Sequence, residues 1–101
     1  MGSRLIINVG GTRFETTRAT IESKDAQETM LSMLLKHHEE GGGELFIDRT
    51  PRFFEWVLHW YRTGILVDHK TVGVPEKVWD AELDFYLIKI EASDQERWLV
   101  F

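Results

Sequence analysis

Apolar and polar residues alternate at the start of the chain with the period of a β-strand. Leu5, Ile7 and Val9 form one alternating set, and Phe14 continues the alternation after Gly10-Gly11. Two adjacent glycines can both take the positive φ values that a two-residue primed turn requires. The sequence therefore predicts a tight hairpin in which position 7 faces position 14 and position 8 faces position 13.

The same register gathers polar residues on the other face of the hairpin. Asn8, Arg13 and Glu15 share that face and leave it largely polar. A phosphate-binding loop is excluded, because such loops need G-x-x-x-x-G-K-[ST] or G-x-G-x-x-G where a strand leads into a helix. Here the two glycines lie between two strand-like runs, so they are interpreted as a turn.

Helical spacing of apolar residues follows at residues 27–36, and the glycines at 41–43 end this segment. The sequence ELFIDR, residues 44–49, then predicts a short strand. The expected apolar side of the helix at residues 27–36 consists of Met30, Leu31, Met33, Leu34 and Leu35.

The strongest helix pattern covers residues 51–63. Pro51 suits its first turn, Gly64 suits the position after its end, and Asp48 or Thr50 can cap it. Apolar side chains cover all of this helix except one narrow strip, so it must be nearly surrounded by this chain or by another. The polar strip consists of Arg52, Glu55, His59 and Arg62.

A last helix is predicted after Pro75, with Trp79, Leu83, Tyr86 and Leu87 at apolar positions. Its acidic face repeats every four residues, and neighbouring carboxylates repel one another on an isolated helix. A basic partner surface would relieve this repulsion, and the association would then weaken as salt rises. A solvated acidic face that aids solubility is the alternative. The acidic face consists of Glu76, Asp80 and Asp84.

The length and charge of the chain limit the classes of function that it can have. A chain of 101 residues is one domain, and we expect residues 4–101 to form it and residues 1–3 to be an expression remnant. With 12 Lys and Arg against 17 Asp and Glu, the net charge of -5 argues against nucleic acid and anionic lipid as partners. No apolar run approaches the roughly 20 residues that span a bilayer, so we expect no membrane insertion. The absence of cysteine suits a reducing, cytoplasmic location.

Catalytic and metal-binding patterns are weak. The chain has no cysteine and no serine in the context G-x-S-x-G. His37 and His38 are adjacent, so they point to different faces of a helix and suit one metal ion poorly. We therefore expect a protein that is not an enzyme and has no cofactor.

Three motifs carry a family resemblance in order and spacing: LIINVGGTRFETTRATI, LFIDRTPRFFEWVLHWYRTGIL and VWDAELDFYLI. Together they resemble the BTB/POZ superfamily, specifically the cytoplasmic tetramerisation domain of voltage-gated potassium channels and its channel-tetramerisation-domain relatives. The resemblance runs from Leu5 to Ile88. It implies a small α/β (α+β) domain with a short, mainly three-stranded sheet, an N-terminal hairpin and about four flanking helices.

The resemblance also implies a partner, namely further copies of the same chain. Such domains form rings through polar faces, as a tetramer in channels and often as a pentamer in the soluble relatives. The motif WYRTG is closer to the channel branch and FIDR to the soluble branch. An adaptor that docks a cullin-type ubiquitin ligase scaffold and a monomeric interaction domain are the alternative functions.

One branch of the family binds zinc between subunits through a histidine and several cysteines. His69 matches that histidine, but the position six residues later is Pro75 and the chain has no cysteine, so zinc of this type is excluded.

The candidate interface residues fall into three groups. The hairpin face and the acidic helix face are two of them, and a third group at the ends of the helix at residues 51–63 supports either the fold or the interface. For this third group we expect a structural role, with Asp48 as a helix cap. If apolar contacts dominate instead, Trp56, Trp60 and Trp98 are the candidates. The polar candidates are Asn8, Arg13, Glu15, Asp48, Arg49, Arg62, Glu76, Asp80 and Asp84.

Overall fold

The computed structural model describes residues 3–39 and 41–89, so Trp98 and most of the predicted N-terminal remnant lie outside the described residues. The elements are β1 (Arg4–Val9), β2 (Thr12–Thr17), α1 (Arg18–Glu22), a 3-10 turn (Asp25–Gln27), α2 (Met30–Lys36), β3 (Leu45–Ile47), α3 (Pro51–Thr63), α4 (His69–Val72) and α5 (Glu76–Phe85).

The three strands form one mixed sheet in the order β2-β1-β3. The hairpin register is as predicted, with Ile7 opposite Phe14 and Asn8 opposite Arg13 in antiparallel strands. Gly10 and Gly11 both have positive φ, at 56° and 103°. β3 pairs with β1 in parallel, and the amide of Gly10 donates a 2.8 Å hydrogen bond to the carbonyl of Ile47. The predicted fold class, an α/β domain built on an N-terminal hairpin, is confirmed.

The described residues contain two short helices that the sequence pattern missed, α1 with five residues and α4 with four. Segments this short show no helical period. Each is begun by a side-chain cap: Thr17 accepts from the amide of Thr20, and Asp68 accepts from the amide of Thr71. The described part of the chain therefore has five α-helices where about four were expected.

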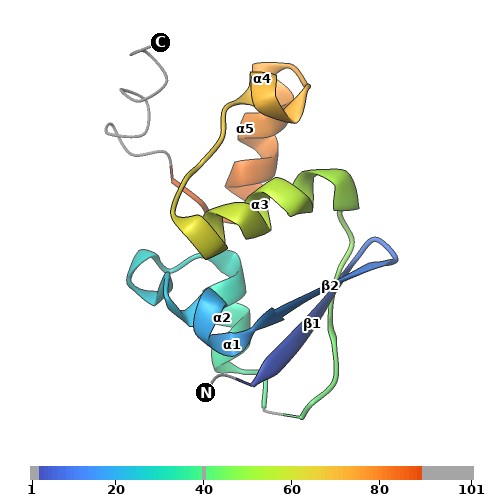
Figure 1. The fold of residues 1–101 in the computed structure, drawn as a ribbon, viewed down its shortest axis with the longest axis vertical. Helices are drawn as coiled ribbons and strands as arrows, with labels where there is room; N and C mark the ends of the chain where they lie inside the picture. The colour runs from blue at the N-terminus through green and yellow to red at the C-terminus, as the bar shows by residue number, and fades with distance from the viewer. Residues whose placement is uncertain (1–2, 40, 90–101) are drawn as a thin grey trace.

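α3 runs across the middle of the molecule, with the sheet, α1 and α2 on one side and α4 and α5 on the other (Figure 1). The prediction of a nearly surrounded helix is borne out in part: Phe53 and Trp56 are only half-buried, and the buried residues of α3 are Phe54, Val57, Leu58, Trp60 and Tyr61. The ring of Phe54 is fully buried and lies 5.0 Å from the ring of Phe14 and 5.6 Å from that of Tyr86. This one side chain therefore connects the hairpin to α5 through the core.

α2 begins three residues later than the sequence pattern suggested. Glu28 has a φ of 52°, which separates the 3-10 turn from the helix. Thr29 then caps α2 by accepting from the amide of Ser32, and it also accepts a 2.6 Å hydrogen bond from the Tyr61 hydroxyl. Burial raises the pKa of Tyr61, which keeps this hydroxyl a donor.

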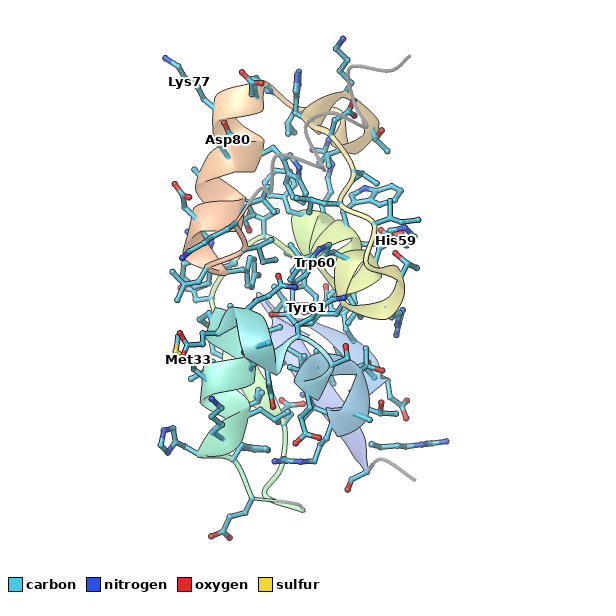
Figure 2. The ribbon with its side chains drawn as sticks, turned by 90° about the vertical axis from the view of Figure 1, so that its left-hand side faces the viewer. Met33, His59, Trp60, Tyr61, Lys77 and Asp80 are labelled. Carbon is cyan, nitrogen blue, oxygen red and sulfur yellow. The ribbon has the colours of Figure 1, made fainter. Side chains whose placement is uncertain are left out.

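The predicted apolar side of α2 is only partly correct. Leu31 and Leu35 are buried, but Met33 and Leu34 are 38% and 42% exposed. Figure 2 shows Met33 on the outside of α2. The helix is short and packs only one narrow stripe against the core, so its other apolar side chains remain at the surface.

The two hairpin glycines give a matched test of how closely the hairpin turn approaches the backbone at Arg49. A Cβ on Gly10 would lie 2.4 Å from the carbonyl oxygen of Arg49, whereas a Cβ on Gly11 would meet nothing within 4 Å. We expect Gly11→Ala to cost about 1–2 kcal/mol of unfolding free energy through its left-handed backbone alone. Gly10→Ala should cost clearly more, because backbone atoms must also move. Chemical denaturation measures both, and equal losses would contradict the close approach.

Candidate functional site

The outer face of the sheet gathers the first group of candidate residues. Leu5, Ile7 and Val9 point into the core, so their neighbours in β1 point outward. The parallel register places Phe46 beside Asn8, and the antiparallel register places Arg13 on the other side of Asn8. We call this surface the sheet face; its residues are Arg4, Ile6, Asn8, Arg13, Glu15, Glu44 and Phe46.

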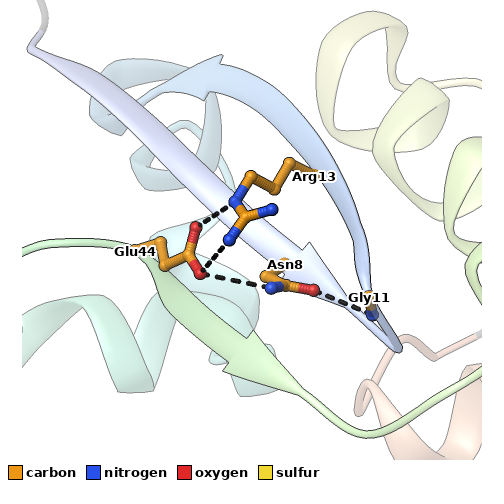
Figure 3. A network of polar contacts seen from close by, with 4 residues as sticks. All are labelled: Asn8, Gly11, Arg13 and Glu44. Atoms are coloured by element: carbon orange, nitrogen blue, oxygen red, sulfur yellow. Dashed lines mark hydrogen bonds and ion pairs between the residues drawn. The ribbon is translucent and has the colours of Figure 1, made fainter.

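A polar network fixes the centre of the sheet face (Figure 3). Arg13 donates to both carboxylate oxygens of Glu44, from Nε at 2.7 Å and from Nη2 at 3.2 Å. Asn8 Nδ2 donates to the same carboxylate at 3.2 Å, and Asn8 Oδ1 accepts from the amide of Gly11 at 2.8 Å. The network therefore ties the start of β3 to the hairpin and holds three polar side chains in one arrangement.

Glu44 is a residue that the sequence analysis missed. It lies 31 residues from Arg13 and follows a glycine run, so no local spacing connects the two. Its hydrogen bonds from Arg13 and then from Asn8 hold the pKa of the Glu44 carboxyl below its ordinary value. The same contact raises the pKa of Arg13.

The remaining charges of the sheet face are also engaged. Arg4 Nη1 forms a 3.0 Å ion pair with Glu15 Oε2. Arg62 Nη2 donates a 2.8 Å hydrogen bond to the backbone carbonyl of Glu15. Arg62 thus fastens the end of α3 to the edge strand β2, which is the structural role expected for it.

Arg49 contacts α5 and not the sheet face. Its Nη2 lies 2.5 Å from Glu82 Oε1, and its guanidinium lies 4.3 Å from the centre of the Phe85 ring. The Glu82 side chain is only 5% exposed. In the sequence, Glu82 is one of several acidic residues of the same helix. Only the three-dimensional structure distinguishes this buried carboxylate from its exposed neighbours.

The predicted helix cap at Asp48 is wrong. The N-cap position of α3 is Thr50, and no side chain makes a cap hydrogen bond there. Pro51 occupies the first turn and has no amide hydrogen, so one fewer donor needs a partner. Asp48 is exposed and lies directly after β3.

The acidic residues of α5 form a second, separate face. Glu76, Asp80 and Asp84 are all exposed, and none of their carboxylates has an ion-pair partner in the described part of the chain. Figure 2 shows Asp80 on the outer side of α5. The structure thus gathers the hairpin candidates into one face, leaves the α5 candidates on another, and gives Arg49 and Arg62 contacts within the fold.

Within residues 3–39 and 41–89, no three His, Cys, Asp or Glu side chains are grouped to hold a metal ion. His69 Nδ1 lies 3.0 Å from the carbonyl oxygen of Val74. None of the described helices combines the length and the apolar character needed to cross a membrane.

Comparison with known proteins gives the family. A family model described as BTB/POZ domain matches residues 5–95. The voltage-gated potassium channel KCNC3 of Homo sapiens is 34% identical over 107 residues, covering 97% of this chain and 13% of the channel. KCNC4 of Homo sapiens is 34% identical over 118 residues, covering 97% and 18%. Potassium voltage-gated channel subfamily A member 10 of Gallus gallus is 33% identical over 97 residues, covering 93% and 18%.

The chain therefore belongs to the BTB/POZ domain family, and the resemblance carried by its three motifs is confirmed. It spans less than a fifth of the length of these curated relatives.

The ion pair of Glu44 gives a prediction for its titration. Removing the guanidinium in Arg13→Gln should raise the pKa of Glu44, because the largest stabilising contact of the carboxylate is lost. A pKa depressed by folding adds stability above the unfolded pKa and loses it as pH falls through the folded pKa. Carboxyl-carbon NMR titration measures this value, with Arg4→Gln as the control that leaves Glu44 unchanged. An unaltered Glu44 titration in Arg13→Gln would contradict the network.

Arg49 and Asp48 are neighbours with different expected roles. Arg49→Ala should lower the unfolding free energy by about 3 kcal/mol, because it leaves the buried Glu82 carboxylate without its cation. Asp48→Ala should change it by less than about 0.5 kcal/mol, as is usual for an exposed side chain without a cap contact. Urea denaturation compares the two variants. A larger loss in Asp48→Ala than in Arg49→Ala would restore Asp48 as the stabilising residue.

Proposed function

We propose that this BTB/POZ domain is a non-enzymatic interaction module that assembles copies of its own chain into a ring of four or five subunits. The relatives are named voltage-gated potassium channels, which supports a place on the cytoplasmic side of such a channel or of a related protein. The observation that carries the proposal is the sheet face, where a preformed polar network lies beside the exposed apolar side chains of Ile6 and Phe46.

Preformed geometry matters for an interface made of polar side chains. Binding normally costs the side-chain freedom that each interface residue loses. Asn8, Arg13 and Glu44 already hold one arrangement in the single chain, so much of this cost is met during folding. A polar surface can then bind a neighbour specifically without a large apolar area.

A closed ring also needs two different faces on each subunit, because each subunit contacts a different surface of the next. The sheet face offers guanidinium groups at Arg4 and Arg13. The acidic face of α5 offers carboxylates that have no ion-pair partner among the described residues. We infer that Asn8, Arg13, Glu15 and Asp48 serve one side of the contact and Glu76, Asp80 and Asp84 the other. Arg49 and Arg62 support them through the fold.

Light scattering tests the proposal directly. The unmodified domain should have the mass of four or five chains. Arg13→Glu should shift that mass towards one chain while helical circular dichroism is retained, since a glutamate at position 13 faces Glu44 and presents the wrong charge to a neighbour.

Lys70→Glu provides the matched control. It makes the same change of charge on an exposed residue of α4 that belongs to neither face, and it should leave the mass unaltered. An unmodified domain that is a monomer at all concentrations would refute self-assembly. An oligomer that tolerates Arg13→Glu would remove the sheet face from the interface.

A further inference from the structure

An aromatic side chain stands exposed on the sheet face. Phe46 is 64% exposed, the largest value among the large hydrophobic residues that the structure describes, and Ile6 on the same face is 39% exposed. Phe46 lies next to Asn8, at the side of the polar network. An exposed aromatic ring with a polar surround is the usual form of an interface anchor.

A groove that could receive such a side chain lies at the carboxyl end of α5. It is lined by Asp80, Leu83, Asp84, Leu87, Ile88 and Lys89. Leu83 and Ile88 are buried, whereas Leu87 is 46% exposed. The groove thus combines apolar side chains with two carboxylates that have no ion-pair partner in the described chain.

The backbone at Leu87 provides an independent observation. Leu87 has a φ of 56°, a left-handed conformation that glycine or asparagine adopts with less strain. The turn is closed by hydrogen bonds from the amide of Leu87 to the carbonyl of Asp84 and from Ile88 to Leu83. A strained leucine would ordinarily be retained for its packing, yet this side chain is nearly half exposed. Leu87 thus ends α5 in a left-handed conformation and leaves an apolar side chain at the surface of the groove.

We propose that Phe46 of one subunit inserts into the α5 groove of the next subunit. The partner is a second copy of this chain, because both complementary surfaces are present on it. Arg13 supports this choice: its side chain is 62% exposed, and its Nη1 makes no hydrogen bond to the described residues, so it can donate to Asp80 or Asp84. The inference rests on the proposed function and names the residues of its contact.

The test uses two variants that each lose one half of the contact. Phe46→Asp removes the anchor and keeps the groove. Leu87→Asn removes the apolar wall and keeps the anchor, while asparagine suits the left-handed backbone. Each variant alone should fall in light-scattering mass from that of the ring to that of a single chain. An equimolar mixture should form a dimer with one copy of each and nothing larger, because only one intact contact is available.

Ile65→Asp is the control, since Ile65 is 50% exposed after the end of α3 and should be replaceable without a change of mass. Circular dichroism checks that each variant is folded. If Phe46→Asp does not fold, Phe46→Ser takes its place. Ring mass in both variants would overturn this contact and leave self-assembly intact. Monomeric variants that fail to pair when mixed would also overturn it. A monomeric unmodified domain would refute the proposed function itself.

Discussion

The burial of α3 is the constraint on which the rest of the structure depends. A helix with apolar side chains on nearly every side is stable only when other elements enclose it. Phe54 contacts the hairpin through Phe14 and α5 through Tyr86, so the two halves of the molecule meet across this helix. The inner faces of the sheet and of α5 are therefore occupied by contacts with α3. The outer face of the sheet and the outer face of α5 are what the domain has left to offer another chain.

Polar contacts at the ends of α3 complete this enclosure. Arg62 donates to the carbonyl of Glu15 in β2, and Arg52 donates to the carbonyls of Val72 and Gly73 at the end of α4. The buried pair of Arg49 and Glu82 differs from these contacts, because Glu82 Oε2 has no hydrogen-bond partner among the described residues. A pair with one unsatisfied oxygen adds little net stability. Its stronger effect is to fix how the loop after β3 lies against α5.

The sequence pattern predicted the hairpin and the limits of α3, because each of these is determined by residues close together in the chain. The hairpin register follows from a period of two and a glycine pair, and the limits of α3 follow from Pro51 and Gly64. Long-range pairs were invisible to the same reasoning: Glu44 meets Arg13 across 31 residues, and Glu82 meets Arg49 across 33. The prediction of Asp48 as a helix cap was wrong for a related reason. Aspartate is a residue type that suits a cap, but its presence does not establish that the backbone places it at the N-cap position of α3.

In the proposed assembly, the sheet face also provides a means by which a polar surface selects its own partner. Its charges are paired within the chain, Arg4 with Glu15 and Arg13 with Glu44, so the attraction left for a neighbour's carboxylates comes from donors that still point outward, such as Arg13 Nη1. A wrong partner would cover these groups without matching the donors that still point outward, and buried polar groups without partners are costly. In that assembly, discrimination therefore comes from the arrangement of Asn8 and Arg13 that Glu44 fixes. Because this arrangement forms with the fold, any change that loosens the start of β3 would weaken recognition before it weakens the core.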